Sequence, residues 1–337
     1  MGEASPWVTS GDVRFETAPS SDVDRSIEWF DGAVAVIRTG SMTQQLKDTN
    51  GELVQATPGA QYLIGFGFGG EGTLRVSLRG AADVVLATSE ASVSQTNGIA
   101  RKFVDLTVPE GTVAAQPLTL AFTSTEGHVL IDKISIAHVR KDGADFTSIF
   151  NGKDLDGWVG VLTGYGVEDG VIRTYPKRAG GNIYTADEYD NFIFRFRFKV
   201  EPGSNNGIAI RAPLGGDAAY QGMEVQVLEN SHKKYAGLKD WQFHGSVYGI
   251  AAAERGYQRP PGEWNDQEIK ADGRRVSVTL NGHVITDIDL DEAMANGTLS
   301  GRDHPGARRA RGHIGFCGHG DLVKFTDLRV LPLDSTK

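Results

Sequence analysis

A glutamate and a glutamine that stand two residues apart are the first candidates for chemistry in this chain. Glu224 and Gln226 alternate with Met223, Val225 and Val227 in the run GMEVQVL. Side chains at i and i+2 of a strand project from the same face, so the three apolar residues point to a core on the other face. A carboxylate can transfer a proton, whereas a side-chain amide only donates and accepts hydrogen bonds. We therefore expect one acid, not a pair, on the outward face.

The strand that precedes this acid in the sequence predicts its surroundings. Gly207, Ala209 and Arg211 alternate with two inward-facing isoleucines and are expected to face outward. The small residues leave room for a ligand, and the Arg211 guanidinium can bind ligand oxygen atoms. The alternative is that Arg211 only forms an exposed ion pair with Glu224, which is a common surface arrangement.

Two histidines lie inside glycine-bounded segments. His319 follows a predicted strand and shares the parity of its outward residues, and His244 shares a parity with Ser246 and Tyr248 if that segment is extended. An imidazole can act as a base, a donor or a metal ligand near neutral pH. A structural hydrogen-bond donor is the competing interpretation for each histidine.

Three more residues are candidates for the wall of a binding cleft. Trp241 and Trp264 can stack on the apolar face of a sugar ring, or they can pack at strand ends. Asp217 lies in the loop between two strands that are expected to border the cleft. It is either part of the cleft wall or an ordinary turn residue.

Composition narrows the class of protein. The 337 residues predict two domains, and 39% hydrophobic with 23% charged residues is typical of a soluble globular chain. The net charge of -9 argues against a nucleic-acid partner. No apolar run reaches the roughly 18 residues of a membrane span, and MGEASPWVTS at the start has no signal-peptide pattern. The single cysteine, Cys317, excludes an internal disulfide and a cysteine-rich zinc site.

Short alternating runs predict an all-β fold with two β-sandwich (jelly-roll) domains. In residues 1–140, runs such as 61–68 (QYLIGFGF) and 73–78 (TLRVSL) read as short strands. Glycine-containing dipeptides at 69–70 and 126–127 read as the turns that separate them.

The alternating pattern restarts after a polar segment. Residues 141–148 are the predicted linker, and residues 149–337 form the predicted second domain. Within it, 192–200 (FIFRFRFKV) alternates phenylalanines with basic residues, and 281–282 (Asn-Gly) is a strong hairpin signal. We expect two stacked sheets.

The second domain also carries a series of motifs in a defined order. They are FNGKDLDGW (150–158), NNGIAIRAP (205–213), GMEVQVL (222–228), HGSVYG (244–249), GEWN (262–265) and GFCGHG (315–320). This series resembles the 3-keto-disaccharide hydrolase domain family over about residues 146–333. The resemblance implies a concanavalin-like jelly roll, a sugar-related activity and a place for Asn206 among the substrate-binding residues. Relatives carry two aspartates where this chain has Glu229 and Asn230, so Glu229 would serve if an acid there binds a ligand.

The resemblance implies an enzyme that cleaves 3-keto-glycosides. Ordinary glycosidases use two carboxylates, but the second position here is Gln226. A ketone at C3 acidifies the C2 hydrogen, so one base can remove it while C1 expels the aglycone, and water then adds. Glu224 or His319 would be the base, and Gln226, Arg211 and His244 would bind the ketone or its enolate.

The remaining expectations concern the other parts of the reaction and the chain. Tyr248 would supply the leaving-group proton, and the partner would be a small carbohydrate. No cofactor is required, but a divalent cation such as calcium can replace some donors, and Asp132 and Glu16 could hold a structural calcium. The first domain resembles a galactose-binding-like or carbohydrate-binding jelly roll.

A non-catalytic glycan-binding protein is the alternative function, because two jelly rolls with aromatic cleft residues also suit binding alone. Sugar-processing jelly rolls of this type are usually exported by bacteria, which predicts a periplasmic or extracellular location. The oligomeric state stays open.

Overall fold

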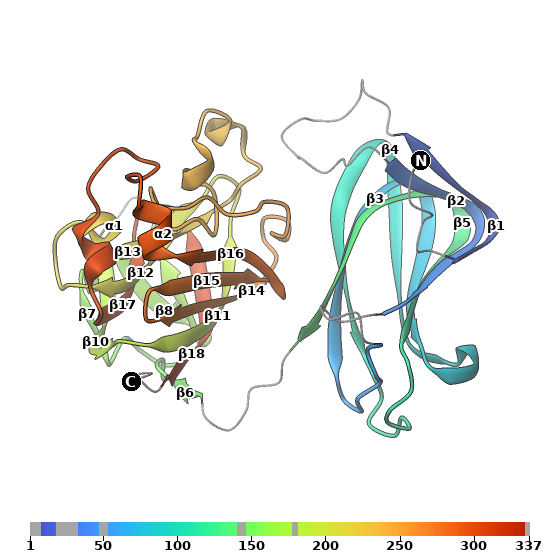
Figure 1. The fold of residues 1–337 in the computed structure, drawn as a ribbon, viewed down its shortest axis with the longest axis horizontal. Coiled ribbons are helices and arrows are strands. Elements are labelled where there is room, and N and C mark those ends of the chain that lie inside the picture. The colour runs from blue at the N-terminus through green and yellow to red at the C-terminus, as the bar shows by residue number, and fades with distance from the viewer. Residues whose placement is uncertain (1–7, 18–32, 47–52, 140–145, 177–180, 334–337) are drawn as a thin grey trace. The chain divides into compact units, whose positions relative to one another are not determined.

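Antiparallel strands make up most of the chain, and the few helices are short (Figure 1). The computed structural model describes residues 8–17, 33–46, 53–139, 146–176 and 181–333, and all statements below concern these. The chain divides into two compact units, Met1–Lys141 and Asp142–Lys337.

The first unit contains one antiparallel sheet of long strands. Its strand order is β1-β2-β5-β3-β4. The strands are β1 (Val8–Thr17), β2 (Ala33–Gln45), β3 (Gln61–Arg79), β4 (Val85–Thr107) and β5 (Thr119–Val139), and the 3₁₀ helix η1 (Ala81–Asp83) joins β3 to β4. Alternate residues of these strands bury a core that is separate from the core of the second unit.

The expected turns at 69–70 and 126–127 are wrong, because both dipeptides lie inside continuous strands. The pairing of β3 with β4 shifts register at 69–70, which marks a bulge. Gly70 has a φ of 87°, and a Cβ there would lie 2.6 Å from the carbonyl oxygen of His128. Glycine at such a position lets a strand bend and approach its neighbour closely without ending. The short strands of the prediction are therefore halves of longer ones.

The second unit consists of two antiparallel sheets. The smaller sheet has the order β13-β12-β17-β10-β7, and the larger has the order β16-β15-β14-β11-β18-β9-β8, with β6 beside β18. The strands of the smaller sheet are β7 (Trp158–Gly160), β10 (Asn182–Tyr189), β12 (Asn205–Ala212), β13 (Met223–Leu228) and β17 (Gly312–Cys317).

The larger sheet and the short helices complete this unit. Its strands are β6 (Thr147–Ser148), β8 (Tyr165–Glu168), β9 (Val171–Thr174), β11 (Phe192–Val200), β14 (Asn265–Asp272), β15 (Arg275–Leu280), β16 (His283–Asp289) and β18 (Val323–Pro332). The helices are α1 (Ala218–Gln221), α2 (Leu290–Met294), η2 (Leu162–Gly164), η3 (Lys233–Tyr235), η4 (Asp240–Gln242) and η5 (Pro305–Arg308).

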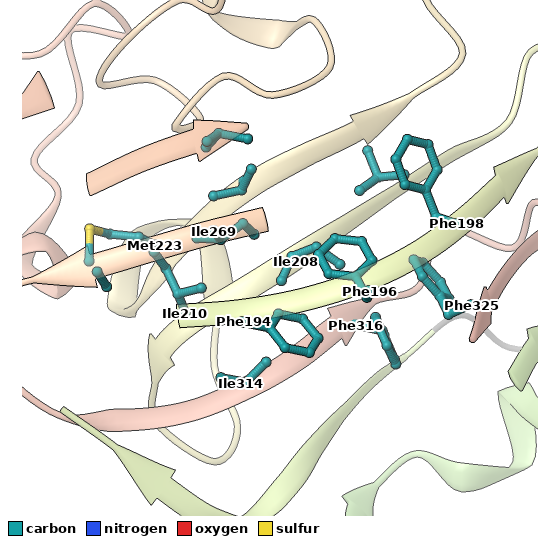
Figure 2. Packing of buried hydrophobic residues seen from close by; sticks show 14 of the residues in the cluster. Phe194, Phe196, Phe198, Ile208, Ile210, Met223, Ile269, Ile314, Phe316 and Phe325 are labelled. Atoms are coloured by element: carbon teal, nitrogen blue, oxygen red, sulfur yellow. The ribbon is translucent and has the colours of Figure 1, made fainter. Parts of the chain in front are cut away.

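Aromatic rings from both sheets fill the space between them (Figure 2). The alternation of β11 is complete, and its phenylalanines are buried while its basic residues are less so. Phe316 of the smaller sheet stacks on Phe325 of the larger at a centroid distance of 4.1 Å, and on Trp158 at 5.1 Å. Because inward positions alternate with outward ones, this core fixes which side chains of the smaller sheet face away from it. The all-β sandwich expected for this part of the chain is confirmed.

Arg211 departs from the expected alternation, and its predicted outward orientation is wrong. It has a φ of 48°, and the pairing of β12 with β17 shifts register between Ala209 and Ala212. This left-handed residue turns the side chain into the protein, where it is fully buried. The guanidinium donates to the carbonyl oxygens of Asp190 at 2.9 Å and Gly273 at 2.8 Å. Arg211 thus ties turns of the fold together and neither pairs with the predicted acid nor reaches a ligand.

Replacing Phe316 with alanine tests the packing between the sheets. We expect Phe316→Ala to lower the free energy of unfolding by about 3–5 kcal/mol, because it removes a buried ring with partners in both sheets. Chemical denaturation measures the loss, and Val284→Ala, at an exposed position, is the control. A loss no larger than that of the control would contradict this packing.

Candidate active site

Side chains on the outer face of the smaller sheet form a row across its strands. Tyr184 of β10 is paired with Gly315 of β17, Gly315 with Ala209 of β12, and Ala209 with Glu224 of β13. Beyond β13, the Tyr248 N–H donates to the Glu224 carbonyl oxygen at 2.8 Å and extends the row. Directly opposed residues share a face of the sheet. The row therefore presents one carboxylate between two tyrosines, with only small residues separating Glu224 from Tyr184.

Glycines give these side chains the room to lie along the sheet. A Cβ at Gly207 would collide with the Oε1 atom of Glu224, and a Cβ at Gly315 would lie 2.5 Å from a ring carbon of Tyr184. Any larger residue at either position would push the carboxylate or the ring away. The sequence predicts that the small residues Gly207 and Ala209 leave room for a ligand. In the structure, the Glu224 carboxylate lies against Gly207 and takes up part of that space.

The predicted alternation of β13 is confirmed, because Met223, Val225 and Val227 belong to the core. Glu224 and Gln226 face the other way, yet both are buried. The interpretation of Glu224 as a solvated residue paired with Arg211 is therefore wrong.

Glu224 and His319 form the central polar pair of this face. The Nε2 atom of His319 lies 3.8 Å from Oε1 of Glu224, and the two side chains are 45% and 8% exposed. Oε1 accepts no hydrogen bond from the described residues. The polar contact of the His319 ring with the Glu224 side chain, and then the negative charge of that carboxylate, raise the pKa of His319 from its ordinary value, although burial opposes the shift. A histidine whose protonated form is favoured therefore lies beside a buried acceptor that has capacity for another partner.

A group of polar residues adjoins this pair, and we call it the polar end of the row: Asn205, Gln226, Lys234, His319 and Asp321. The Gln226 amide nitrogen donates to Oδ1 of Asn205 at 2.6 Å. The Asn205 N–H donates to Oδ2 of Asp321 at 3.1 Å, and Nζ of Lys234 lies 3.8 Å from the same oxygen.

Sequence reasoning missed Asn205, Asp321, Lys234 and Tyr184 as site residues. Asn205 has the same strand parity as Gly207, so the alternation of β12 was sufficient to find it. Asp321 stands two residues after His319, which was a weaker signal. Lys234 belongs to a short 3₁₀ helix, and no sequence pattern brings it to this face.

His244 does not join this site. Its ring stacks on the core residue Phe198 at 4.9 Å, and its Nδ1 accepts the Leu228 N–H at 3.4 Å. Burial lowers the pKa of His244 to about 3, so the ring is neutral. The expected shared parity fails because Gly245 has a φ of 83°, which breaks the alternation of an extended segment. The predicted contact of His244 with substrate is corrected to a structural role.

Two other predicted binding residues also lie away from Glu224. The Trp264 ring contacts Arg197 and Lys199, at centroid distances of 5.7 and 4.9 Å, on the outer face of the larger sheet. Asn206 is fully buried and lies on the same side of β12 as the core residue Ile208. Strand parity, which places Asn205 outward, places Asn206 inward.

Trp241 and Asp217 do lie beside the row. The Trp241 ring meets Tyr248 edge to face at 5.0 Å. Asp217 caps helix α1, since its Oδ1 accepts the Ala219 N–H at 3.2 Å. Ala218 of that helix packs with Tyr184 and other outward residues of the smaller sheet. Asp217 is therefore both a turn residue and a neighbour of the site.

Glu229 and Cys317 have structural surroundings. The Glu229 carboxylate accepts backbone N–H groups of Gly203 at 2.9 Å and Ser231 at 2.8 Å. Burial and the nearby Glu224 carboxylate raise the pKa of the Cys317 thiol, which keeps it protonated. Backbone donors therefore occupy the Glu229 carboxylate, whereas Cys317 lies on the outer face beside Glu224 as a protonated thiol.

Two features are absent from the described part of the chain. No three histidine, cysteine, aspartate or glutamate side chains gather there in a way that could hold a metal ion. No helix among those residues is long and apolar enough to cross a membrane. The side chains of Asp132 and Glu16, considered above for calcium, lie outside the described ones.

Titration of His319 tests the pair directly. We expect Glu224→Gln to lower the pKa of His319 toward its ordinary range, because the negative charge that stabilises the imidazolium is removed. NMR titration of the ring measures the shift, with Glu263→Gln as the control. Equal His319 pKa values in the wild type and in Glu224→Gln would contradict the pairing.

Several known proteins are similar to this chain. The chain is similar to a 3-keto-disaccharide hydrolase of Bacteroides thetaiotaomicron, with 27% identity over 232 residues, which is 57% of this chain and 80% of that protein. It is also similar to a crystal structure of a candidate glycosyl hydrolase from Parabacteroides distasonis, with 28% identity and a TM-score of 0.50 over 56% of this chain and 99% of that one. A second candidate glycosyl hydrolase of that organism is 27% identical, with a TM-score of 0.49 and coverages of 56% and 94%.

A family model also matches the chain. The model of the 3-keto-alpha-glucoside-1,2-lyase-like domain matches residues 145–331, which include the Glu224 row and the polar end. The resemblance inferred from the motif series is thereby confirmed. Since the match spans more than half of its length, the chain belongs to the family of 3-keto-alpha-glucoside-1,2-lyase-like domains.

Proposed function

We propose that this chain cleaves 3-keto-glycosides by removing the C2 proton, expelling the aglycone from C1 and adding water. The family and the relative named a 3-keto-disaccharide hydrolase support a hydrolase-type enzyme with a carbohydrate substrate. The finer mechanism rests on one observation: Glu224 is the single carboxylate of β13, it is buried on the outer face, and the next outward position of the strand is the amide of Gln226. Hydrolysis of an unoxidised glycoside usually needs a second carboxyl group in a catalytic role.

The proposed reaction proceeds in two balanced steps. Glu224 takes the C2 proton, the C–H electrons form the enolate of the C3 ketone, and the enolate expels the aglycone oxygen from C1 as that oxygen gains a proton. Water then adds across the C1–C2 double bond, with its hydroxyl on C1 and a proton returned to C2. The net reaction consumes one water and releases the 3-keto sugar and the aglycone alcohol.

Glu224 is the better candidate for the base, and His319 for the donor to the enolate oxygen. Glu224 raises the pKa of His319, which favours the protonated ring and so favours His319 as a hydrogen-bond donor to the enolate oxygen. The imidazolium is also the more exposed of the two groups, at the side from which substrate must arrive. A cation beside a developing enolate stabilises its charge.

A tyrosine hydroxyl supplies the leaving-group proton in this proposal. Tyr248, the residue favoured by the sequence, accepts the Gln242 amide N–H at 3.2 Å. Tyr184, at the other end of the row, accepts the Asn182 amide N–H at 2.9 Å, and burial raises its pKa. A hydroxyl that accepts such a bond still has its own proton to donate.

Three wider expectations remain part of the proposal. Side chains of this chain carry every step, so a divalent cation, which the sequence allows, has no assigned role. The first unit serves as a carbohydrate-binding domain of the galactose-binding-like type. The protein acts in the periplasm or outside the cell, where oxidised glycosides from the surroundings are met first.

Matched substrates test the proposed chemistry. We expect purified protein to cleave a 3-keto-glucoside and to leave the parent glucoside intact, because only the ketone acidifies C2. Glu224→Gln should lower kcat by about 100-fold or more, as removal of a general base does. Product release, followed by chromatography with Glu263→Gln as the control, measures both. Equal cleavage of both sugars would overturn the elimination, and glycan binding without any product would favour the non-catalytic alternative.

A glycine substitution tests whether the position of the carboxylate matters. Gly207→Ala should lower kcat by about 100-fold, because its Cβ displaces the Glu224 carboxylate and small misplacements carry costs of that order. Gly237→Ala is the matched control, since nothing lies within 4 Å of a Cβ there. Unchanged turnover in Gly207→Ala, with an intact fold by circular dichroism, would remove the positional argument.

A further inference from the structure

A pocket opens beside the row at Tyr184. Its volume is about 530 Å³, within the usual range for small-molecule sites. The walls come from β7 and the residue after it, from the start of β10, and from the loop before α1. The lining residues are Val159, Gly160, Val161, Gly181, Asn182, Tyr184, Leu214, Gly215 and Gly216.

The walls of this pocket carry exposed apolar side chains. Val161 is 42% exposed and Leu214 is 57% exposed, although folding alone gives no reason to leave such residues in water. Leu162, next to Val161, is exposed as well. Eight large hydrophobic side chains are exposed among the described residues; two of them line this pocket, and a third, Leu162, is adjacent to one of the two in the sequence. Clustered apolar exposure is typical of a surface that a ligand covers.

The polar end and the pocket therefore differ in chemistry. The polar end offers amides and charged groups, whereas the pocket offers mostly valine, leucine and glycine surface, together with the Asn182 amide and the Tyr184 hydroxyl. Sugar hydroxyls lose hydrogen bonds to water when bound and need polar partners in exchange. The keto sugar thus fits the polar end and the small residues beside Glu224, and the substituent on its C1 extends toward the pocket.

We propose that this pocket is the aglycone subsite and that it selects apolar, ring-sized aglycones over a second sugar. This inference rests on the proposed function. Tyr184 is the lining residue that carries a hydroxyl, and its ring lies over Gly315 on the row that leads to Glu224. Because Tyr184 belongs to both the pocket and the row, we assign the leaving-group proton to Tyr184 in preference to Tyr248.

The proton balance closes through the same tyrosine. Tyr184 gives its proton to the glycosidic oxygen as the C1–O bond breaks and becomes a tyrosinate. When water adds, its hydroxyl joins C1, its proton returns to Tyr184, and Glu224, whose acquired proton exchanges with the medium before this step, protonates C2. Both side chains end in their starting states, and no further reactant is needed.

Competing aglycones on one keto sugar test the inference. We expect benzyl 3-keto-glucoside to have a kcat/KM at least about tenfold above that of methyl 3-keto-glucoside and of a 3-keto-disaccharide, because an apolar pocket rewards added apolar surface. Benzyl alcohol and methanol are leaving groups of similar acidity, so the comparison reports binding rather than intrinsic reactivity.

Leu214→Ser should lower the ratio of benzyl to methyl kcat/KM by about tenfold. Leu299→Ser is the matched control, because Leu299 is 56% exposed, close to the 57% of Leu214, but lies outside the pocket. The ratio of benzyl to methyl kcat/KM in Leu299→Ser should equal that of the wild type. Cleavage of all three substrates without preference, or an unchanged ratio in Leu214→Ser, overturns the subsite while the proposed function stands. No cleavage of any of them overturns both.

Discussion

The buried carboxylate of Glu224 is the constraint on which the rest of this site depends. A charged group removed from water is costly unless the protein supplies a counter-charge or hydrogen bonds. Here the counter-charge is His319, at 3.8 Å, and the space is provided by Gly207, where no side chain would fit beside Oε1. Because Oε1 accepts no hydrogen bond from the described residues, the acid keeps its capacity to take a proton.

The fold fixes the position of Glu224 along β13 and the face of the sheet from which its side chain projects. Alternate residues of β13 are locked in the core, and the core is held by rings such as Phe316 and Phe325 that touch across the two sheets. A shift of one residue in β13 would move Glu224 from the outer face to the interior, so register and chemistry are coupled. Arg211, which looked like a ligand-binding residue, contributes instead by joining turns at one end of the sheets.

Alternation predicted the site wherever the backbone is regularly extended and failed where it is not. It placed Glu224 and Gln226 correctly, because β13 is regular, and it gave the core face of β11 in full. It failed at Arg211, whose φ is 48°, and at His244, which precedes the left-handed Gly245. No local sequence pattern predicts a left-handed non-glycine residue, so the direction of the Arg211 side chain could not be predicted from the sequence.

Tertiary arrangement accounts for the other differences. Trp264 had the right type of side chain, but only the sheet order shows that it lies on the larger sheet, away from Glu224. Lys234 and Tyr184 come to the site through a loop helix and a distant strand, which no spacing in the sequence encodes. The motif series identified the region of the site correctly. The residues of such a series occur together in proteins that share the same tertiary arrangement, so the series carries information that spacing alone does not.

Isotope incorporation at C2 tests the central claim most directly. Cleavage of a 3-keto-glucoside by the enzyme in D₂O should give a released sugar that carries deuterium at C2, beyond the exchange of the same sugar incubated without enzyme. Elimination followed by hydration requires that label, because the C2 hydrogen leaves and a proton from the medium replaces it. A product that keeps its original C2 hydrogen would contradict the account, because direct displacement at C1 never breaks that bond.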